Sequence, residues 1–223
     1  MNIFFDTEFT GLVPNTTLIS IGMVAETGEK FYAEFTDYNR ELVNPWIQEN
    51  VIDNLYLDGF IPKIYDDGIE RVRDIDGVRY SIGPTEWNKD SIEDWLEEVF
   101  NMGAEPIQLV SDVCHYDMYL LCNQVFGGAF NLPGLVNPVC YDICQDLSGY
   151  NANDSWLQKM IDAGHRPTYS YPIADSDSME LAFNTSRELW CQAFNDGKLP
   201  EGAKHNALYD AEVIKMIYEG IRR

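Results

Sequence analysis

The chain has 223 residues, of which 45% are hydrophobic, so it can bury a sizeable core. We expect one domain over residues 1–223, with insertions at 56–90 and 150–200. The longest apolar runs are short and broken by charge, which excludes a membrane-spanning helix. Because the N-terminus lacks a basic region followed by an apolar stretch, we expect no signal peptide and a cytoplasmic location.

The balance of charge is strongly acidic. Fifteen basic residues stand against 37 acidic ones, which gives a formal net charge of −22. A protein that grips a nucleic-acid duplex normally carries a basic face. The composition therefore favours one of two interpretations. Either the protein does not act on nucleic acid, or it touches only a few nucleotides and uses bound metal ions as its positive charge.

The five cysteines are an odd number in a chain without a secretion signal, so we expect no disulfide framework. Cys140 and Cys144 could form half of a zinc site, but no second pair of Cys or His at ligand spacing accompanies them. We interpret these thiols as small buried hydrophobic groups.

The first half of the chain begins with strand-like segments. Apolar residues predict strands at 2–5, 17–24 and 30–35, and the turn residues at 26–29 predict an antiparallel three-stranded meander. Apolar residues at helical spacing predict a helix over 44–55. Residues 56–88 are irregular, with a small hairpin at 73–80, and we interpret them as an insertion or flap.

Helices dominate the second half. An amphipathic helix is predicted at 90–100, where Asp90 and Glu93 resemble a capping box. A short strand at 107–110 precedes a helix over 117–126, which Gly127 and Gly128 should end. The prediction continues with a weak strand at 139–142, a mostly irregular region to 174, and helices over 178–194 and 206–222. The whole pattern predicts an α/β fold, with a mixed β-sheet flanked by helices.

Three acidic motifs stand out because together they suit one metal site. They are Asp6-Thr7-Glu8, Asp117 within the segment 115–121, and His205-x4-Asp210. Carboxylates can hold two divalent cations roughly 3.5–4 Å apart for phosphodiester hydrolysis, and a histidine can serve as general base. Asp6 and Glu8 alternate along a strand and so point to one face, and Asp117 and Asp210 would face them from helices. His205 should lie just before the last helix.

The order of these motifs resembles the DEDDh branch of the ribonuclease H-like 3′→5′ exonucleases. The resemblance rests on three segments: Asp6-Thr7-Glu8-Phe9-Thr10-Gly11-Leu12, Tyr116-Asp117-x-x-Leu120-Leu121, and His205-x-Ala207-x-x-Asp210-Ala211. The small bacterial and phage exoribonucleases first described in mycobacteria are similar in further segments: Phe4-Phe5-Asp6-Thr7-Glu8-Phe9, Leu18-Ile19-Ser20-Ile21-Gly22, and Trp46 followed by Val51. In one departure, Asp112 and Val113 stand where the second motif often has His-Asn. Asp112 is thereby an alternative ligand, and the Tyr-Asp context favours Asp117.

The resemblance implies a role for each matched residue. Asp6, Glu8, Asp117 and Asp210 would bind two Mg²⁺ or Mn²⁺ ions, which prefer oxygen ligands. His205 would be the general base. Backbone near Phe9 and Thr10 would meet the terminal 3′-hydroxyl, and Leu12 would wedge against the last bases.

The activity implied is metal-dependent release of 5′-nucleotides from single-stranded or overhanging RNA 3′ ends. Single-stranded DNA stays open as a substrate, because no motif here identifies a contact to the 2′-hydroxyl. A homodimer is compatible with the sequence. The alternative to an enzyme is a non-catalytic acidic protein on the same fold, for example a nucleic-acid mimic, which the net charge would favour.

Overall fold

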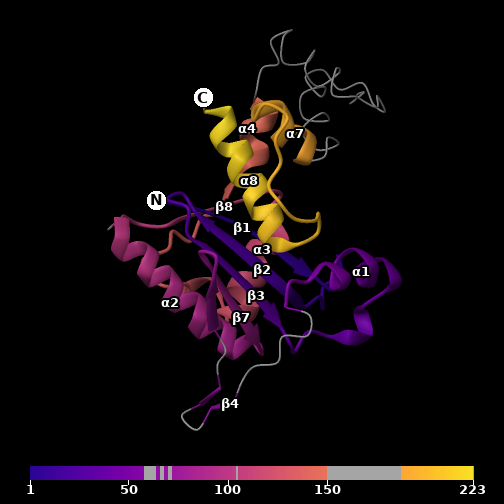
Figure 1. The fold of residues 1–223 in the computed structure, drawn as a ribbon. Coiled ribbons are helices and arrows are strands. Elements are labelled where there is room, and N and C mark those ends of the chain that lie inside the picture. The colour runs from indigo at the N-terminus through magenta and orange to yellow at the C-terminus, as the bar shows by residue number, and fades with distance from the viewer. Residues whose placement is uncertain (58–63, 66–67, 70–71, 104, 150–186, 223) are drawn as a thin grey trace.

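A seven-stranded mixed sheet forms the centre of the protein (Figure 1). The computed structural model describes residues 1–57, 64–65, 68–69, 72–103, 105–149 and 187–222. The strand order is β6-β7-β3-β2-β1-β8-β9. The bounds of these strands, in chain order, are β1 Asn2–Phe9, β2 Leu18–Ala25, β3 Lys30–Phe35, β6 Val72–Ile75, β7 Val78–Gly83, β8 Gln108–Ser111 and β9 Tyr141–Asp142.

The predicted meander is confirmed, because β1 pairs with β2 and β2 pairs with β3, both antiparallel. Strand β1 runs four residues beyond its predicted end, since its polar end continues the ladder with β2 as far as Phe9. The sheet is mixed because β8 is parallel to β1, β9 is parallel to β8 and β7 is parallel to β3. The predicted strand at 107–110 thus lies beside β1, in the interior of the sheet.

Helices cover both faces of the sheet (Figure 1). Alternation along β1 sends Ile3 and Phe5 to a core shared with helix α2, Thr85–Gly103, and sends Phe4 to a core shared with helix α8, Ala207–Ile221. Helix α7, Arg187–Phe194, packs on α8. The fold is therefore α/β with a mixed sheet flanked by helices, as predicted, and it is consistent with a ribonuclease H-like fold.

Helix α2 begins five residues earlier than predicted. Its first N–H group is satisfied by a distant residue, because the Asp37 carboxylate accepts from the Thr85 N–H with both oxygens, at 3.0 and 3.1 Å. Asp90 therefore lies inside the helix, and the predicted capping box of Asp90 and Glu93 is wrong. A cap supplied through tertiary structure leaves no local signal in the sequence.

Two other helices differ from their prediction in their bounds and in their helix type. The segment 44–55 forms helix α1, Pro45–Asn50, whose N-cap Asn44 accepts from the Ile47 N–H, and then a separate 3-10 turn, η2 Ile52–Asn54. The helix predicted from residue 117 begins at the preceding turn as α3, His115–Leu120, and continues as a π-helical turn, η3 Leu121–Val125. Gly127 and Gly128 follow with φ of 69° and 148°, as expected for a helix end.

The hairpin predicted at 73–80 is confirmed as β6 and β7. It is part of the main sheet and not a flap apart from it, since β7 pairs with β3 along its whole length. A helix, α4 Ile143–Gly149, lies where we predicted irregular chain. Residues 150–174 and the first part of the helix predicted at 178–194 are outside the described residues. The single domain and its insertions stay predictions.

The other described elements are short: η1 Arg40–Leu42, β4 Ile64–Tyr65, β5 Gly68–Ile69 and η4 Ala129–Asn131. The five cysteines are free thiols. Within the described ranges, no helix combines the length and the apolar character that crossing a membrane requires. The cytoplasmic location stays a prediction.

Candidate active site

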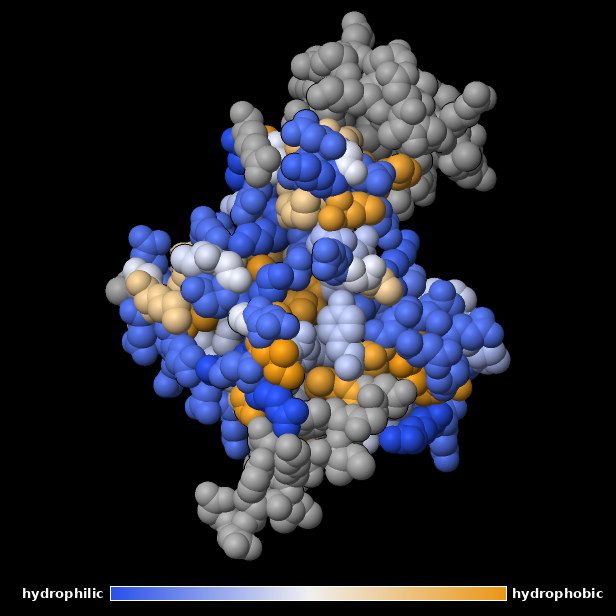
Figure 2. Space-filling model, viewed as in Figure 1, coloured by the Kyte–Doolittle hydropathy of each residue, from blue (hydrophilic) through white to orange (hydrophobic). Residues whose placement is uncertain are grey.

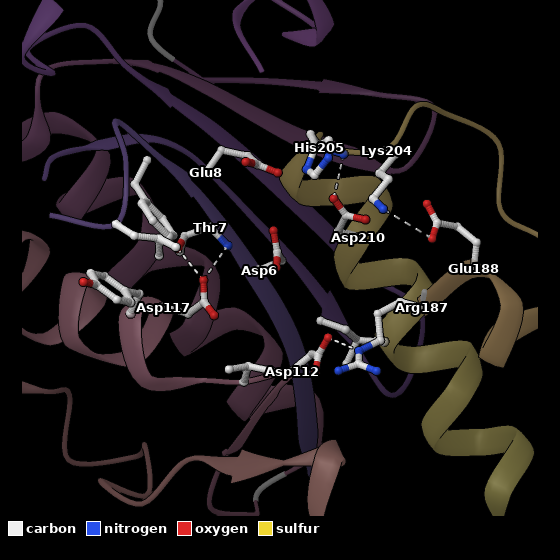
Figure 3. A pocket seen from close by; sticks show the side chains of 15 residues that line it. Asp6, Thr7, Glu8, Asp112, Asp117, Arg187, Glu188, Lys204, His205 and Asp210 are labelled. Atoms are coloured by element: carbon white, nitrogen blue, oxygen red, sulfur yellow. Dashed lines mark hydrogen bonds and ion pairs between the residues drawn. The ribbon is translucent and has the colours of Figure 1, made fainter. Parts of the chain in front are cut away.

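A recess of about 320 Å³ lies where the polar end of β1 meets the starts of α3 and α8 (Figure 3). It brings together all five residues predicted for catalysis and metal binding, from three segments far apart in the chain: Asp6, Glu8, Asp117, His205 and Asp210. Glu8, His205 and Asp210 each place a ligand atom within 4.8 Å of the others. The recess thus contains acidic groups that could bind a metal ion.

Strand β1 supplies both first-motif carboxylates and also holds the third. Alternation places Asp6 and Glu8 on the same side of β1 as Phe4, toward α8. Thr7 points the other way, and its N–H and Oγ1 both donate to Asp117 Oδ1, at 3.1 and 2.5 Å. One strand therefore fixes three of the four carboxylates.

The turn between β8 and α3 orients Asp117. In this turn Val113 has a φ of 49°, which is strained for a β-branched residue. The Asp142 carboxylate holds it there by accepting from the N–H groups of Val113 and Cys114, each at 3.2 Å. The Ser111 hydroxyl donates to Asp117 Oδ2 at 3.3 Å, so Asp117 points into the recess with both oxygens engaged.

Asp112, the alternative ligand, also lines the recess but has different partners. Its carboxylate forms an ion pair with Arg187 at the start of α7, and it accepts from the Cys144 thiol at 2.9 Å. Because a guanidinium already neutralises Asp112, this carboxylate is less suited than Asp117 to bind a cation. The geometry favours Asp117, as the sequence context did.

The start of α8 brings the third motif against the sheet. Asn206 caps the helix: its side chain accepts from the N–H groups of Leu208 and Tyr209, and its amide donates to the Asn54 carbonyl at 2.9 Å. His205 lies just before the helix, as predicted, with a φ of 62°. Its N–H donates to Asp210 Oδ2 at 2.9 Å, which links the two predicted site residues directly.

A glycine in β2 permits this approach. Gly22 pairs with Asp6 across the ladder, and a Cβ built on Gly22 would lie 2.3–2.4 Å from backbone atoms of Ala207 and Leu208. Only a residue without a side chain allows the first turn of α8 to come so close to the sheet. Gly22 therefore sets the distance between Asp210 and the carboxylates of β1.

The four carboxylates disfavour one another's charge. Burial, followed by repulsion from Asp117, Asp210 and Glu8, raises the pKa of Asp6 well above its usual range. The pKa of Glu8 rises well above its usual range, chiefly through burial and then through Asp210 and Asp117. Burial raises the pKa of Asp117 to about 6 and that of Asp210 to about 7.

The cations that line the recess offset this repulsion only in part: Lys204 lowers the pKa of Asp210, but burial outweighs it, and both cations are paired with other carboxylates. Arg187 pairs with Asp112, and the Lys204 ammonium lies 3.8 Å from the Glu188 carboxylate (Figure 3). The donor set of four clustered carboxylates fits hard divalent cations, which bind oxygen and would relieve the repulsion.

The surroundings of His205 favour the neutral form of its imidazole. Burial, and then the nearby charge of Lys204, lower the pKa of its imidazole, while Glu188 opposes the shift. The ring meets the exposed indole of Trp46 edge to face, with centroids 5.0 Å apart. A neutral imidazole beside the carboxylates can accept a proton, and it is also close enough to be a metal ligand.

The three residues predicted to bind substrate are placed differently. Phe9 lines the recess and stacks on Tyr116, with ring centroids 5.3 Å apart. Leu12 lines the recess with 74% of its surface exposed. Thr10 is buried: its N–H donates to the Thr17 carbonyl and its hydroxyl accepts from the Thr17 N–H. Its side chain holds the loop after β1 and does not line the recess.

Several residues that shape the site were not among the predicted site residues. They are Thr7, Gly22, Arg187, Glu188 and Lys204. Thr7 could have been noticed, because it lies between two candidate ligands on a strand. The others depend on contacts between distant segments, which no local pattern records.

Comparison with known proteins identifies two relatives of the chain. No model of a known protein family matches it. It is 30% identical over 137 residues to the 3′-5′ exoribonucleases MT2234.1 and Rv2179c of Mycobacterium tuberculosis, strains CDC 1551 and H37Rv. The match covers 61% of this chain and 67% of each relative. This favours the enzymatic interpretation over the non-catalytic one, and the chain belongs to the family of these 3′-5′ exoribonucleases.

Proposed function

We propose that the protein is a metal-dependent exonuclease that removes 5′-nucleotides from single-stranded or overhanging RNA 3′ ends. The observation that carries the proposal is the convergence of Asp6, Glu8, Asp117 and Asp210 on one recess that His205 also lines. The residues match the order of the DEDDh pattern, and the relatives' name supplies the direction and the RNA substrate.

The four carboxylates would hold two Mg²⁺ or Mn²⁺ ions. When bound, such ions activate water for attack on phosphorus and stabilise the charge on the leaving oxygen. The protein's own part is to hold the carboxylates together despite their repulsion. Thr7 and Ser111 fix Asp117, and the His205 N–H fixes Asp210.

His205 would accept the proton of the attacking water. Burial keeps its imidazole in the neutral form near neutral pH, which a general base requires. Its position before α8 is fixed from two sides, by the bond from its N–H to Asp210 and by the Trp46 ring.

Phe9 and Leu12 would contact the terminal nucleotide at the wall of the recess. The recess is small and its own cations are paired, so it suits a strand end more than a duplex. Single-stranded DNA is the second candidate substrate, since no described residue here is identified as a contact to the 2′-hydroxyl.

A direct test uses RNA labelled at its 5′ end, with and without a single-stranded 3′ overhang. We expect products that shorten one nucleotide at a time in Mg²⁺ or Mn²⁺, and no products in excess EDTA. Asp6→Asn should abolish the ladder. Asp74→Asn, at an exposed carboxylate in β6, is the matched control and should leave it unchanged. Undiminished turnover in EDTA would overturn the proposal.

A further inference from the structure

A second recess, of about 390 Å³, lies beside the candidate active site. It is lined by Val13, Pro14, His115, Tyr116 and Tyr119. The two recesses adjoin, because Tyr116 lines both of them, and because Leu12 lines the first while its neighbour Val13 lines the second. A strand whose 3′ end occupied the first recess could therefore extend into the second.

Helix α3 builds one wall of this second recess. His115 and Tyr119 are one turn apart on the same face of the helix, while Asp117 points into the first recess. The Tyr116 ring between the two recesses is held by its stack on Phe9, whose planes are 15° apart. The wall thus presents aromatic rings whose positions are partly fixed before any ligand binds.

The loop after β1 contributes Val13 and Pro14 to the lining of the second recess, and hydrogen bonds within the loop hold its shape. Thr10 accepts from the Thr17 N–H at 2.9 Å, and the Thr16 N–H donates to the Val13 carbonyl at 3.1 Å. These bonds close the loop so that Val13 and Pro14 stand at its outer side. A flat group could lie between this loop and the tyrosines.

The residues that line the second recess indicate what kind of group it can bind. This recess has no carboxylate among its lining residues, in contrast to its neighbour. Tyr119 keeps 51% of its surface exposed and Val13 keeps 37%, so a flat apolar surface faces water here. Aromatic side chains bind nucleobases by stacking, and stacking needs no positive charge. This suits a chain of net charge −22, which cannot rely on gripping phosphates.

We infer that the second recess is a base-stacking subsite for a nucleobase of the substrate strand, on the 5′ side of the nucleotide that is removed. The inference rests on the proposed function and adds to it the contact by which an acidic enzyme would hold single-stranded RNA. Four residues line this subsite and not the first recess, and two of them, Tyr119 and His115, carry rings that can stack on a base.

The test combines a substitution with a change in the substrate. Short RNAs that lack the base at one position at a time are compared with the intact RNA, using the wild type and Tyr119→Ala in Mg²⁺. At one position upstream of the cleaved nucleotide, loss of the base should lower kcat/KM of the wild type about 5- to 150-fold, the range of base–aromatic stacking. In Tyr119→Ala, kcat/KM for the intact RNA should fall by a similar factor. Removal of the base from the RNA should then lower kcat/KM of this variant no further.

Two control variants and one substitute for Tyr119→Ala complete the test. Tyr119→Phe keeps the ring and loses only the hydroxyl, which accepts from the Asn123 amide at 3.3 Å, so it should behave as the wild type. Phe130→Ala removes a fully exposed aromatic ring that lines neither recess and should also be neutral. His115→Ala should weaken the same upstream position if Tyr119→Ala fails to fold.

The outcomes separate the subsite from the reaction. If wild-type protein hydrolyses RNA but Tyr119→Ala retains the full penalty for the missing base, the subsite is overturned and the proposed function stands. If no upstream base affects the wild type, the subsite is likewise overturned. If the wild type hydrolyses no RNA with any metal, both proposals fall. A dimer that Tyr119→Ala dissociates would assign this face to a second copy of the chain and overturn the subsite.

Discussion

At the scale of single residues, the site is governed by the burial of four carboxylates, to which repulsion between them adds. No cation of the described residues is among the causes that shift the pKa of Asp6, which is raised by burial and by four neighbouring acids. A folded protein keeps such an arrangement only when something else requires it. Binding of divalent cations is the requirement that these residues fit.

Replacing the imidazole tests its role separately from metal binding. We expect His205→Ala to lower kcat by roughly 10²–10⁴ while metal affinity changes little, because a general base acts on the attacking water. Asp210→Asn should weaken both metal binding and turnover. Calorimetric titration with Mn²⁺, alongside rates on end-labelled RNA, measures the two effects. A large loss of metal affinity in His205→Ala would make the imidazole a ligand instead of a base.

The raised pKa values predict how stability depends on pH. A carboxyl whose pKa is higher in the folded protein stabilises it fully below the unfolded value near 3.8, and that contribution is lost as pH rises through about 6 for Asp117 and about 7 for Asp210. Without metal, the free energy of unfolding should therefore fall as pH rises from about 5 to about 8. His205, with its lowered pKa, acts in the opposite direction, but it is one group against four.

Thermal unfolding in EDTA and in Mn²⁺ checks this expectation. In EDTA, Tm should be higher near pH 5 than near pH 8, and the difference should shrink in an Asp6→Asn/Asp210→Asn variant. In Mn²⁺ the trend should reverse, since metal binds the deprotonated carboxylates. A Tm in EDTA that rises toward pH 8 would show that these groups are not buried together.

At the scale of elements, the site depends on how closely one helix approaches one sheet. Strand β1 and helix α8 come from opposite ends of the chain, and Gly22 in β2 allows them to meet. Asn206 then ties the first turn of α8 to the 3-10 turn η2, through the Asn54 carbonyl. The position of Asp210 relative to the carboxylates of β1 therefore depends on the close contact between α8 and the sheet.

Enlarging the glycine tests the contact. In Gly22→Ala the new methyl would overlap backbone atoms of Ala207 and Leu208, so the start of α8 must move. We expect a loss of roughly 1–3 kcal/mol in the free energy of unfolding, from overpacking. The displaced ligand should lower activity about 10²-fold as well. Chemical denaturation and RNA hydrolysis measure these losses.

Gly134→Ala is the matched control, because a Cβ there meets no atom within 4 Å. It should change neither stability nor activity. Full activity in Gly22→Ala would mean that α8 does not set the position of Asp210.

At the scale of the whole molecule, the acidic charge limits how nucleic acid can bind. The described surface on the face drawn in Figure 2 is largely hydrophilic, with hydrophobic residues in small groups. A net charge of −22 repels a phosphate backbone over most of the surface. Binding through a strand end, bound cations and stacked bases avoids most of that repulsion.

The dependence of binding on salt should reflect this mode. A protein that holds only a strand end releases few counterions, so log Kd against log salt should have a slope equivalent to about one to three phosphates. Blunt duplexes should be poor substrates. Fluorescence anisotropy with labelled RNA and the slow His205→Ala variant in Mg²⁺ gives the slope. A slope equivalent to roughly six phosphates or more, or a preference for duplex, would reveal a basic groove.

The sequence by itself predicted the meander, the hairpin at 73–80, the last helix and the convergence of the motifs. Periodicity and turn residues are local, and alternation along β1 places Asp6 and Glu8 on one face wherever the strand lies. The position of His205 before α8 followed equally from its spacing to Asp210. These features need no knowledge of what packs against them.

Tertiary structure alone decided the rest, because the causes lie far away in the chain. The early start of α2 depends on Asp37, the orientation of Asp117 depends on Thr7, and the pairing of β7 with β3 joins a hairpin to the sheet. Asp117 is favoured over Asp112 as a metal ligand because Asp112 pairs with Arg187, which lies 75 residues further along the chain. Hydrogen bonds and ion pairs between distant segments form only once the chain has folded, so no window of sequence contains them.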